Sequence, residues 1–392
     1  MNEAYIVAAM RAAGGRRGGR LANWHPADLA AQVINALVDR TDCDPDIIDD
    51  VVLGCVSQAG QQSMNIARNA VLASRLPESV PGTSVDRQCG SSQQALQFAA
   101  QAVMSGNMDV VIAGGVESMT RVPMFSTFVL HEKNGLGSYV SPNMHQRYPG
   151  VEFSQFTGAE MMAEKYNLPK DALDRFALRS HTLAIEATNK GHFDDEIVPV
   201  PLRLPDGNAT DELHTVDEGI RFDASLEGIA GVKLIADGGR VSAATASQIC
   251  DGASGVIVVN EKGLKALGAK PMARIHHMSV MGHDPVIMLE APLPATERAL
   301  KKTGMKIDDI DLFEVNEAFA PVPLAWLQAT GADPDRLNVN GGAIALGHPL
   351  GASGTKLTTT LIHALRQRNK RYGLQTMCEG GGMANVTIFE RL

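Results

Sequence analysis

Two spacings of apolar residues alternate along the first 120 positions of the chain. Apolar runs of strand length lie at residues 4–9, 49–54 and 109–115. Between these runs, apolar residues recur every three or four positions from residues 26, 64 and 95, and this spacing predicts helices. The run at 109–115 is almost continuous, which is typical of a central strand covered on both faces. This order of elements predicts an α/β fold with a mostly parallel sheet.

The middle third of the chain breaks the alternation. Residues 119–240 are richer in Met, His, Pro, Gly and charged residues, and they contain one clear helical pattern, from Pro169 to Lys190. An excursion of this length from an α/β scaffold is typical of a lid or a substrate-binding insertion. The alternative is a structural arm or an arm that contacts another subunit.

The last 120 residues repeat features of the first 120. An acidic turn leads into an apolar run at 307–315, as it does at 46–53. A turn of small residues leads into a helical pattern at 351–365, as it does after Cys89. This repetition predicts an internal duplication, with two similar halves whose corresponding turns face one another.

Composition and charge limit the class of function. A hydrophobic content of 44% and a charged content of 20% describe a soluble globular protein, and 392 residues suffice for two or three domain-sized units. The net charge of -9 argues against nucleic acid or an anionic membrane as the main partner. Local basic patches could still bind a phosphorylated cofactor.

The cysteine pattern and the apolar runs indicate the cellular compartment of the protein. The five cysteines are scattered without a C-x-x-C motif, which favours neither a disulfide framework nor a zinc site. No apolar run approaches transmembrane length. We therefore expect an enzyme of the reducing cytoplasm, although an organelle enzyme that has lost a transit peptide would look the same.

Cys89 lies where a short run of polar and small residues meets a helical pattern. At a helix N-terminus, unpaired backbone N–H groups and the helix dipole favour a thiolate over a thiol. Arg87 adds a second positive charge. The interpretation is a nucleophilic cysteine; the alternative is a buried free cysteine that packs as a small hydrophobic residue.

Three further segments carry polar side chains among glycines or at a strand end. Asn316 follows an apolar run, where its amide can hold a water or a carbonyl group or simply cap a helix. His348 lies in a glycine-rich stretch at 338–354 and suits a base or an oxyanion donor, the alternative being a structural histidine. Cys378 precedes the glycines at 380–382, whose backbone N–H groups could form half of an oxyanion hole.

Together, five segments of the chain resemble the thiolase family of acetyl-CoA acyltransferases. They are residues 89–92 (CGSS), 114–119 (GGVESM), 316–319 (NEAF), 347–354 (GHPLGASG) and 378–382 (CEGGG). The resemblance implies the thiolase fold, in which two βαβαβαββ halves form a five-layered α/β/α/β/α core with an inserted loop domain. It places the N-terminal half at residues 1–118 plus 241–268, the loop domain at 119–240 and the C-terminal half at 269–392.

The resemblance also implies a role for each catalytic group. Cys89 corresponds to the nucleophile that accepts the acyl group, and His348 to the base that activates it. Cys378 corresponds to the second thiol, which moves the proton at the α-carbon. Asn316 corresponds to the residue that holds a water which, with His348, stabilises the enolate oxygen. The backbone N–H groups of Cys89 and Gly380 would form a second oxyanion hole.

Coenzyme A is the expected co-substrate, with acyl-CoA as the partner molecule. The resemblance places it beside Ala243, Ala246, Ser247, Ala318 and Phe319, with Ser247 near the pantetheine arm. It implies neither a metal nor a tightly bound cofactor. It further implies a homodimer or a homotetramer, with no nucleic-acid or membrane partner.

Three departures from the family pattern bear on the substrate. Residues 154–160 (SQFTGAE) stand where short-chain biosynthetic thiolases carry a His-Met-Gly element. Glu379 replaces a usually apolar residue, and Ala384 replaces a glycine. The pattern is most similar to a degradative branch that includes actinobacterial thiolases of steroid-ring catabolism.

We therefore expect a 3-ketoacyl-CoA thiolase that uses coenzyme A to release acetyl-CoA and a shortened acyl-CoA. The alternatives are an acetyl-CoA C-acetyltransferase that condenses two acetyl-CoA molecules and a non-catalytic acyl-CoA binding protein.

Overall fold

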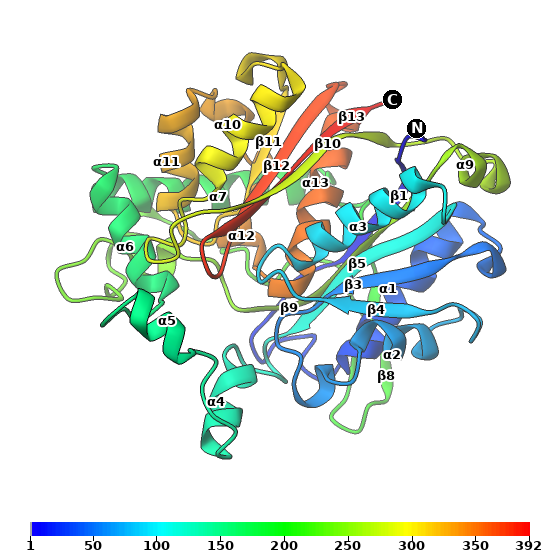
Figure 1. Ribbon diagram of the computed structural model, residues 1–392, viewed down its shortest axis with the longest axis horizontal. Helices are drawn as coiled ribbons and strands as arrows, with labels where there is room; N and C mark the ends of the chain where they lie inside the picture. Colours follow the sequence, from blue (N-terminus) through cyan, green and yellow to red (C-terminus); the bar gives the residue numbers. More distant parts are fainter. Residues whose placement is uncertain (1) are drawn as a thin grey trace.

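The computed structural model describes residues 2–392 and shows two halves built in the same order (Figure 1). The N-terminal half consists of β1 (Tyr5–Ala12), α1 (Pro26–Thr41), β3 (Asp50–Gly54), α2 (Ile66–Ala73), β4 (Gly82–Val85), α3 (Ser91–Ser105), β5 (Val110–Ser118) and β9 (Cys250–Val259). A two-residue strand, β2 (Gly15–Arg16), pairs with β9. The predicted βαβαβαββ order is confirmed in this half.

The C-terminal half follows helix α9 (Glu261–Leu267). It consists of β10 (Ala273–Gly282), α10 (Pro292–Thr303), β11 (Leu312–Val315), α11 (Pro321–Thr330), α12 (Ala343–Leu346), α13 (Ser353–Gln367), β12 (Tyr372–Glu379) and β13 (Met383–Arg391). The counterpart of β4 is reduced here to an isolated parallel bridge between Phe313 and Leu337. The duplication is therefore visible in the order of elements, with one strand nearly lost.

The strand order is the same in the two halves. It runs β4-β3-β5-β9-β1 in the first and β11-β12-β13-β10 in the second, and an antiparallel contact of β1 with β10 joins the two. The pairs β3–β5 and β11–β12 are parallel, whereas β9 and β13 are antiparallel to both of their neighbours. The prediction of a mostly parallel sheet is wrong. The turn between β12 and β13 is too short for the crossover that parallel pairing requires, and β5 and β9 pair antiparallel although the long insertion lies between them.

The core has the five layers that the family resemblance implies. Side chains of α3 and α13 pack between the two halves of the sheet in one buried cluster. Helices α1 and α2 cover the outer face of the N-terminal half, and α10 and α11 cover the outer face of the C-terminal half (Figure 1). Strand β5 has buried side chains on both faces. Val110 and Ile112 pack in the cluster with α1 and α2, and Val111 and Ala113 pack in the cluster with α3 and α13.

The insertion lies between β5 and β9, where the C-terminal half has only a short turn between β12 and β13. It contains α4 (Ser126–Lys133), α5 (Pro142–Arg147), α6 (Gln155–Lys165), α7 (Lys170–Asn189), β6 (Ile197–Val198), β7 (Val200–Arg203), β8 (Ala209–His214) and α8 (Leu226–Ala230). Helices α6 and α7 pack against the C-terminal half, and β6 pairs with β1. The insertion thus contacts both halves, and the helix predicted from Pro169 to Lys190 is confirmed as α7.

None of the helices among residues 2–392 has both the length and the apolar character needed to cross a membrane.

The two central helices approach most closely at Gly354, in the first turn of α13. A Cβ atom added there would lie 2.1 Å from the backbone nitrogen of Gln93 on α3. We predict that Gly354→Ala lowers the free energy of unfolding by about 1–3 kcal/mol, because the helices must move apart. Thermal melting followed by circular dichroism measures the effect. Gly282→Ala is the control, since a Cβ there meets no atom within 4 Å, and equal melting temperatures for the two variants would contradict the prediction.

Candidate active site

Five residues predicted to be catalytic lie on four segments beside the central helices. Cys89 lies in the turn between β4 and α3, and His348 in the corresponding loop between α12 and α13. Asn316 follows β11, Cys378 lies near the end of β12, and Gly380 follows that strand. Because the first turns of α3 and α13 touch at Gln93 and Gly354, the turns that carry Cys89 and His348 face each other.

A tight turn fixes Cys89 at the start of α3. The N–H of Gly90 donates to the carbonyl of Arg87 at 3.1 Å, and the N–H of Arg87 donates to Oγ of Ser91 at 2.9 Å. Gln88 has a φ of +50°, in the left-handed region that non-glycine residues seldom adopt. Backbone strain of this kind is common at functional sites, where the surrounding structure enforces it.

A cavity of about 440 Å³ opens beside these segments. His348, Met119, Leu350 and Phe156 line it. Cys89 packs in one small cluster with Met119 and Leu350, so its sulfur lies next to the lining of the cavity. The residues predicted to contact coenzyme A also line this cavity, and they are Ala243, Ala246, Ser247, Ala318 and Phe319.

Hydrogen bonds fix the tautomer of His348. The hydroxyl of Ser353 donates to the carbonyl of Pro349 at 2.8 Å, so its oxygen must accept from Nδ1–H of His348. Nε2 is then the unprotonated nitrogen, and it lies 3.4 Å from Nδ2 of Asn316. His348 therefore presents a lone pair at Nε2, as a general base requires.

Burial decides the protonation of the pair formed by Cys89 and His348. Burial, together with the charge of Lys356, lowers the pKa of His348 to about 3, so the imidazole is neutral at physiological pH. Burial raises the pKa of Cys89 to about 12, and the carboxyl group of Glu379 acts in the same direction. The expectation of a resting thiolate at the helix N-terminus is wrong, because burial outweighs the helix. Arg87 is not among the main groups that shift the pKa of Cys89, and its Nη1 contacts the sulfur of Met383.

Cys378 is 1% exposed. Burial raises its pKa well above the usual range, and the nearby Cys89 and Glu379 raise it further. The influence of Cys89 places the two sulfurs in one site. A thiol that stays protonated at neutral pH can donate its proton to a carbanion.

Asn316 is buried, and its Oδ1 accepts no hydrogen bond from residues 2–392. Its Nδ2 points toward Nε2 of His348. Asn316 lines a separate small cavity of about 10 Å³ rather than the cavity of 440 Å³. An amide with a free oxygen there can bind a water molecule, which is the role that the family resemblance implies.

Several residues of the site escaped the sequence reasoning. Ser353 orients His348, although its only signal was its place five residues later in the glycine-rich stretch. Arg16, Arg17 and Arg221 line the cavity with Ser247 and Phe319. The first two belong to a basic cluster near the N-terminus that is plain in the sequence, and the fold adds Arg221.

Glu117 was also missed as an individual residue, although it lies in the segment 114–119. Its buried carboxyl group accepts hydrogen bonds from the backbone of Val56, Ser57 and Gly351 at 2.9–3.0 Å. It therefore braces the turn between His348 and α13 against the N-terminal half.

Comparisons with known proteins identify the family of the chain. The N-terminal domain of thiolases matches residues 4–262, and the C-terminal domain of thiolases matches residues 269–391. The steroid 3-ketoacyl-CoA thiolase FadA6 of Mycobacterium tuberculosis is 52% identical, over 100% of this chain and 95% of its own length. A 3-ketoacyl-CoA thiolase of Serratia proteamaculans is 41% identical over 100% of both chains.

A solved structure shares the same architecture. The acetyl-CoA acetyltransferase of Bacillus anthracis superposes with a TM-score of 0.91 at 35% identity, covering 100% of this chain and 99% of the other. The family prediction and the fold prediction are both confirmed. With both halves matched and the duplicated fold in place, the chain belongs to the thiolase family of acyltransferases.

Proposed function

We propose that the chain is a 3-ketoacyl-CoA thiolase that transfers the acyl group through Cys89 to coenzyme A. The observation that carries the proposal is a neutral His348, held with Nε2 unprotonated on the wall of the cavity next to which Cys89 packs. The names of full-length relatives at 41–52% identity support the substrate class.

In the first half-reaction, Nε2 of His348 takes the proton of Cys89 as the thiolate attacks the ketone carbon of the substrate. The bond between the α-carbon and the former ketone carbon breaks, and its electron pair becomes the enolate of acetyl-CoA. His348, now protonated, and the amide of Asn316 with its water stabilise the enolate oxygen. Cys378 gives its proton to the α-carbon, which leaves acetyl-CoA and an acyl group on Cys89.

In the second half-reaction, the thiolate of Cys378 takes the proton of an incoming coenzyme A thiol. The thiolate of coenzyme A then attacks the carbonyl carbon of the acyl group on Cys89. The backbone N–H groups of Cys89 and Gly380 stabilise the tetrahedral oxyanion. The shortened acyl-CoA leaves. His348 returns the proton to the sulfur of Cys89, so both thiols end as they began.

The arginines at the cavity suit the phosphates of coenzyme A. Arg16, Arg17 and Arg221 are exposed and line the same cavity as Ser247 and Phe319, in a chain whose net charge is -9. Their guanidinium groups match the geometry of phosphate oxygens. We place the nucleotide end of coenzyme A beside them and its thiol toward Cys89.

We further propose that the natural substrate is a branched or ring-derived 3-ketoacyl-CoA. Gln155 and Phe156, from the segment that departs from short-chain thiolases, line the cavity. The 52% identical relative is named a steroid thiolase. Condensation of two acetyl-CoA molecules is the alternative, since the solved relative is named an acetyl-CoA acetyltransferase.

We further propose that the protein forms a homo-oligomer and resides in the cytoplasm. Strand β4 is an edge strand of the sheet and only partly buried, which suits pairing with a second copy in a homodimer or homotetramer. All five cysteines are unpaired, which suits the reducing cytoplasm.

Cys89 and Cys378 have different tasks, so their variants differ. We predict that Cys378→Ala still takes up an acyl group on Cys89 from a simple acyl-CoA, because a coenzyme A thiolate can leave without the proton that Cys378 would give, whereas a carbanion cannot. Acylation from a 3-ketoacyl-CoA slows at least about hundredfold, since nothing protonates the α-carbon. Mass spectrometry of the peptide that contains Cys89 measures both rates. Cys89→Ala is the control and shows no adduct; equal slowing of both reactions in Cys378→Ala would contradict the assignment.

The substrate proposal predicts a ranking of acyl-CoA molecules. We expect kcat/KM for thiolysis of a ring-derived 3-ketoacyl-CoA to exceed that for acetoacetyl-CoA by at least about tenfold, because additional apolar contacts lower the transition-state energy. A spectrophotometric assay of thiolysis across a panel of chain lengths gives the values. Equal or faster cleavage of acetoacetyl-CoA, or faster condensation of acetyl-CoA than thiolysis, would refute this substrate.

The proposed phosphate contacts predict that Arg221→Gln weakens the binding of coenzyme A but not that of pantetheine. We expect KM for coenzyme A to rise about tenfold, which corresponds to one charge-assisted hydrogen bond. KM for pantetheine as the acyl acceptor stays unchanged, because pantetheine lacks the phosphates. Arg175→Gln is the control, since Arg175 is exposed on α7 and pairs with Asp171. A rise of the same size for both acceptors would count against the phosphate role.

A further inference from the structure

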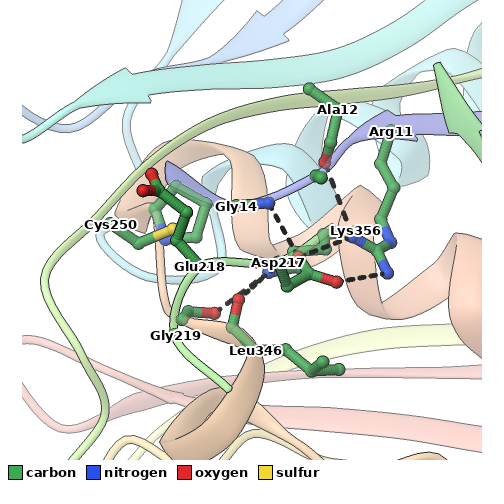
Figure 2. A network of polar contacts seen from close by, with 12 residues as sticks. Arg11, Ala12, Gly14, Asp217, Glu218, Gly219, Cys250, Leu346 and Lys356 are labelled. Carbon is green, nitrogen blue, oxygen red and sulfur yellow. Dashed lines mark hydrogen bonds and ion pairs between the residues drawn. The ribbon is translucent and has the colours of Figure 1, made fainter. Parts of the chain in front are cut away.

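Four buried charged side chains form a cluster that contacts the backbone just before His348. Figure 2 shows Arg11, Asp217 and Lys356 of this cluster beside Leu346. Arg11 comes from β1, Glu196 and Asp217 from the insertion, and Lys356 from α13. The first three side chains are 0% exposed and that of Lys356 is 8% exposed. The cluster contains two cations and two anions, and it joins both halves of the fold to the insertion.

Asp217 is the centre of this cluster. It accepts hydrogen bonds from Nη1 and Nη2 of Arg11 at 2.9 and 3.0 Å and from the N–H of Gly14 at 2.7 Å. Nζ of Lys356 lies 3.6 Å from its Oδ1. Burial alone would raise the pKa of Asp217, but Arg11 and Lys356 lower it to about 2. Asp217 is therefore an anion at physiological pH and a fixed partner for Lys356.

Lys356 also holds the backbone just before His348. Its Nζ donates to the carbonyl of Leu346 and, at 3.3 Å, to the carbonyl of Gly347. Gly347 has a φ of +81°, so a left-handed turn delivers His348 to the cavity. On the other side of this turn, the N–H of His348 donates to the carbonyl of Gln248 at 3.0 Å. The position of Nε2 of His348 thus depends on the carbonyl groups of Leu346 and Gly347, which both accept hydrogen bonds from the ammonium group of Lys356.

The charge of Lys356 reaches His348, although Lys356 is not among the residues that line the 440 Å³ cavity. The other titratable groups beside Lys356 are Cys250 and Glu314, in addition to the cluster itself. Burial raises the pKa of Cys250 to about 12 and that of Glu314 well above its usual range, so both are neutral. Among the titratable groups near Lys356, His348 is the one that lines the 440 Å³ cavity.

We propose that Lys356 is a positioning residue for the catalytic base. Anchored by Asp217, it holds the carbonyls of Leu346 and Gly347 and thereby fixes the position of Nε2 of His348 at the cavity. This inference rests on the proposed role of His348 and deepens it. It assigns a function to a side chain that contacts neither the substrate cavity nor the reacting atoms.

Three variants separate the charge of Lys356 from its hydrogen bonds. Lys356→Arg keeps both, Lys356→Gln keeps a donor without charge, and Lys356→Met removes both. We expect kcat for thiolysis to fall less than about threefold, about tenfold and about hundredfold in that order, because a base displaced by 1 Å loses about a hundredfold in rate. KM for coenzyme A stays within about twofold of the wild-type value, since the cavity is unchanged.

The pH profile of kcat/KM is the readout that a purely structural role would not move. Removing the nearby cation makes the imidazolium less unfavourable and raises the pKa of His348. The acid limb of the profile therefore shifts to higher pH in Lys356→Gln and Lys356→Met, and it stays in place in Lys356→Arg.

Thr359→Val is the matched control on the same helix. Thr359 is 0% exposed, and its hydroxyl has no hydrogen-bond partner among residues 2–392. We expect wild-type kcat and an unshifted acid limb. Melting temperatures report folding, and if Lys356→Met does not fold, the comparison of Lys356→Gln with Lys356→Arg decides. Two outcomes would overturn the inference: an unchanged kcat with an unshifted pH profile in Lys356→Gln, or equal losses of kcat in Lys356→Gln and Lys356→Arg. In either case, thiolysis by the unmodified enzyme would still uphold the proposed function. A wild-type enzyme without thiolysis would overturn both.

Discussion

The contact between the first turns of α3 and α13 is the constraint on which the site depends. The absence of a side chain at Gly354 lets the backbone of one central helix rest against Gln93 of the other. Each half of the duplicated fold carries a loop immediately before its central helix. The close contact therefore brings Cys89 of one half and His348 of the other to the same cavity, although 258 residues of sequence lie between them.

Burial gives the site its chemical character. It raises the pKa of both thiols and lowers that of His348, so the resting catalytic groups carry no charge. In the proposed mechanism, proton transfer from Cys89 to His348 becomes favourable only when a substrate brings an electrophilic carbon and its own polar groups. Glu117 and Asp217 keep their oxygen atoms bonded to backbone or cationic groups outside the cavity. The carboxylate groups that hold the loops in place thus lie outside the cavity, apart from the side chains proposed to react.

Apolar periodicity predicted most elements well, because strands such as β5 and helices such as α7 carry strong local patterns. The antiparallel pairing of β12 and β13 could not be predicted, since it depends on a connection too short for a crossover rather than on strand composition. A run of polar and small residues before a helical pattern pointed to Cys89, and glycine-rich stretches pointed to His348 and Cys378. Lys356 reads as an ordinary helical residue, and only the folded chain places its ammonium group under Gly347. The protonation of Cys89 likewise depends on burial, which local sequence does not reveal.

The insertion leaves and re-enters the sheet between neighbouring strands, and this has an evolutionary consequence. β5 and β9 stay paired up to Ser118 and Asp251, so the ends of the insertion are held together whatever its length. The entropy of closing such a loop grows only slowly with the number of residues. Segments such as 154–160 can therefore be lengthened, shortened or exchanged between relatives with little effect on the sheet. Selection can change the part of the cavity wall that the insertion supplies while the segments that carry Cys89, Asn316, His348 and Cys378 stay in place.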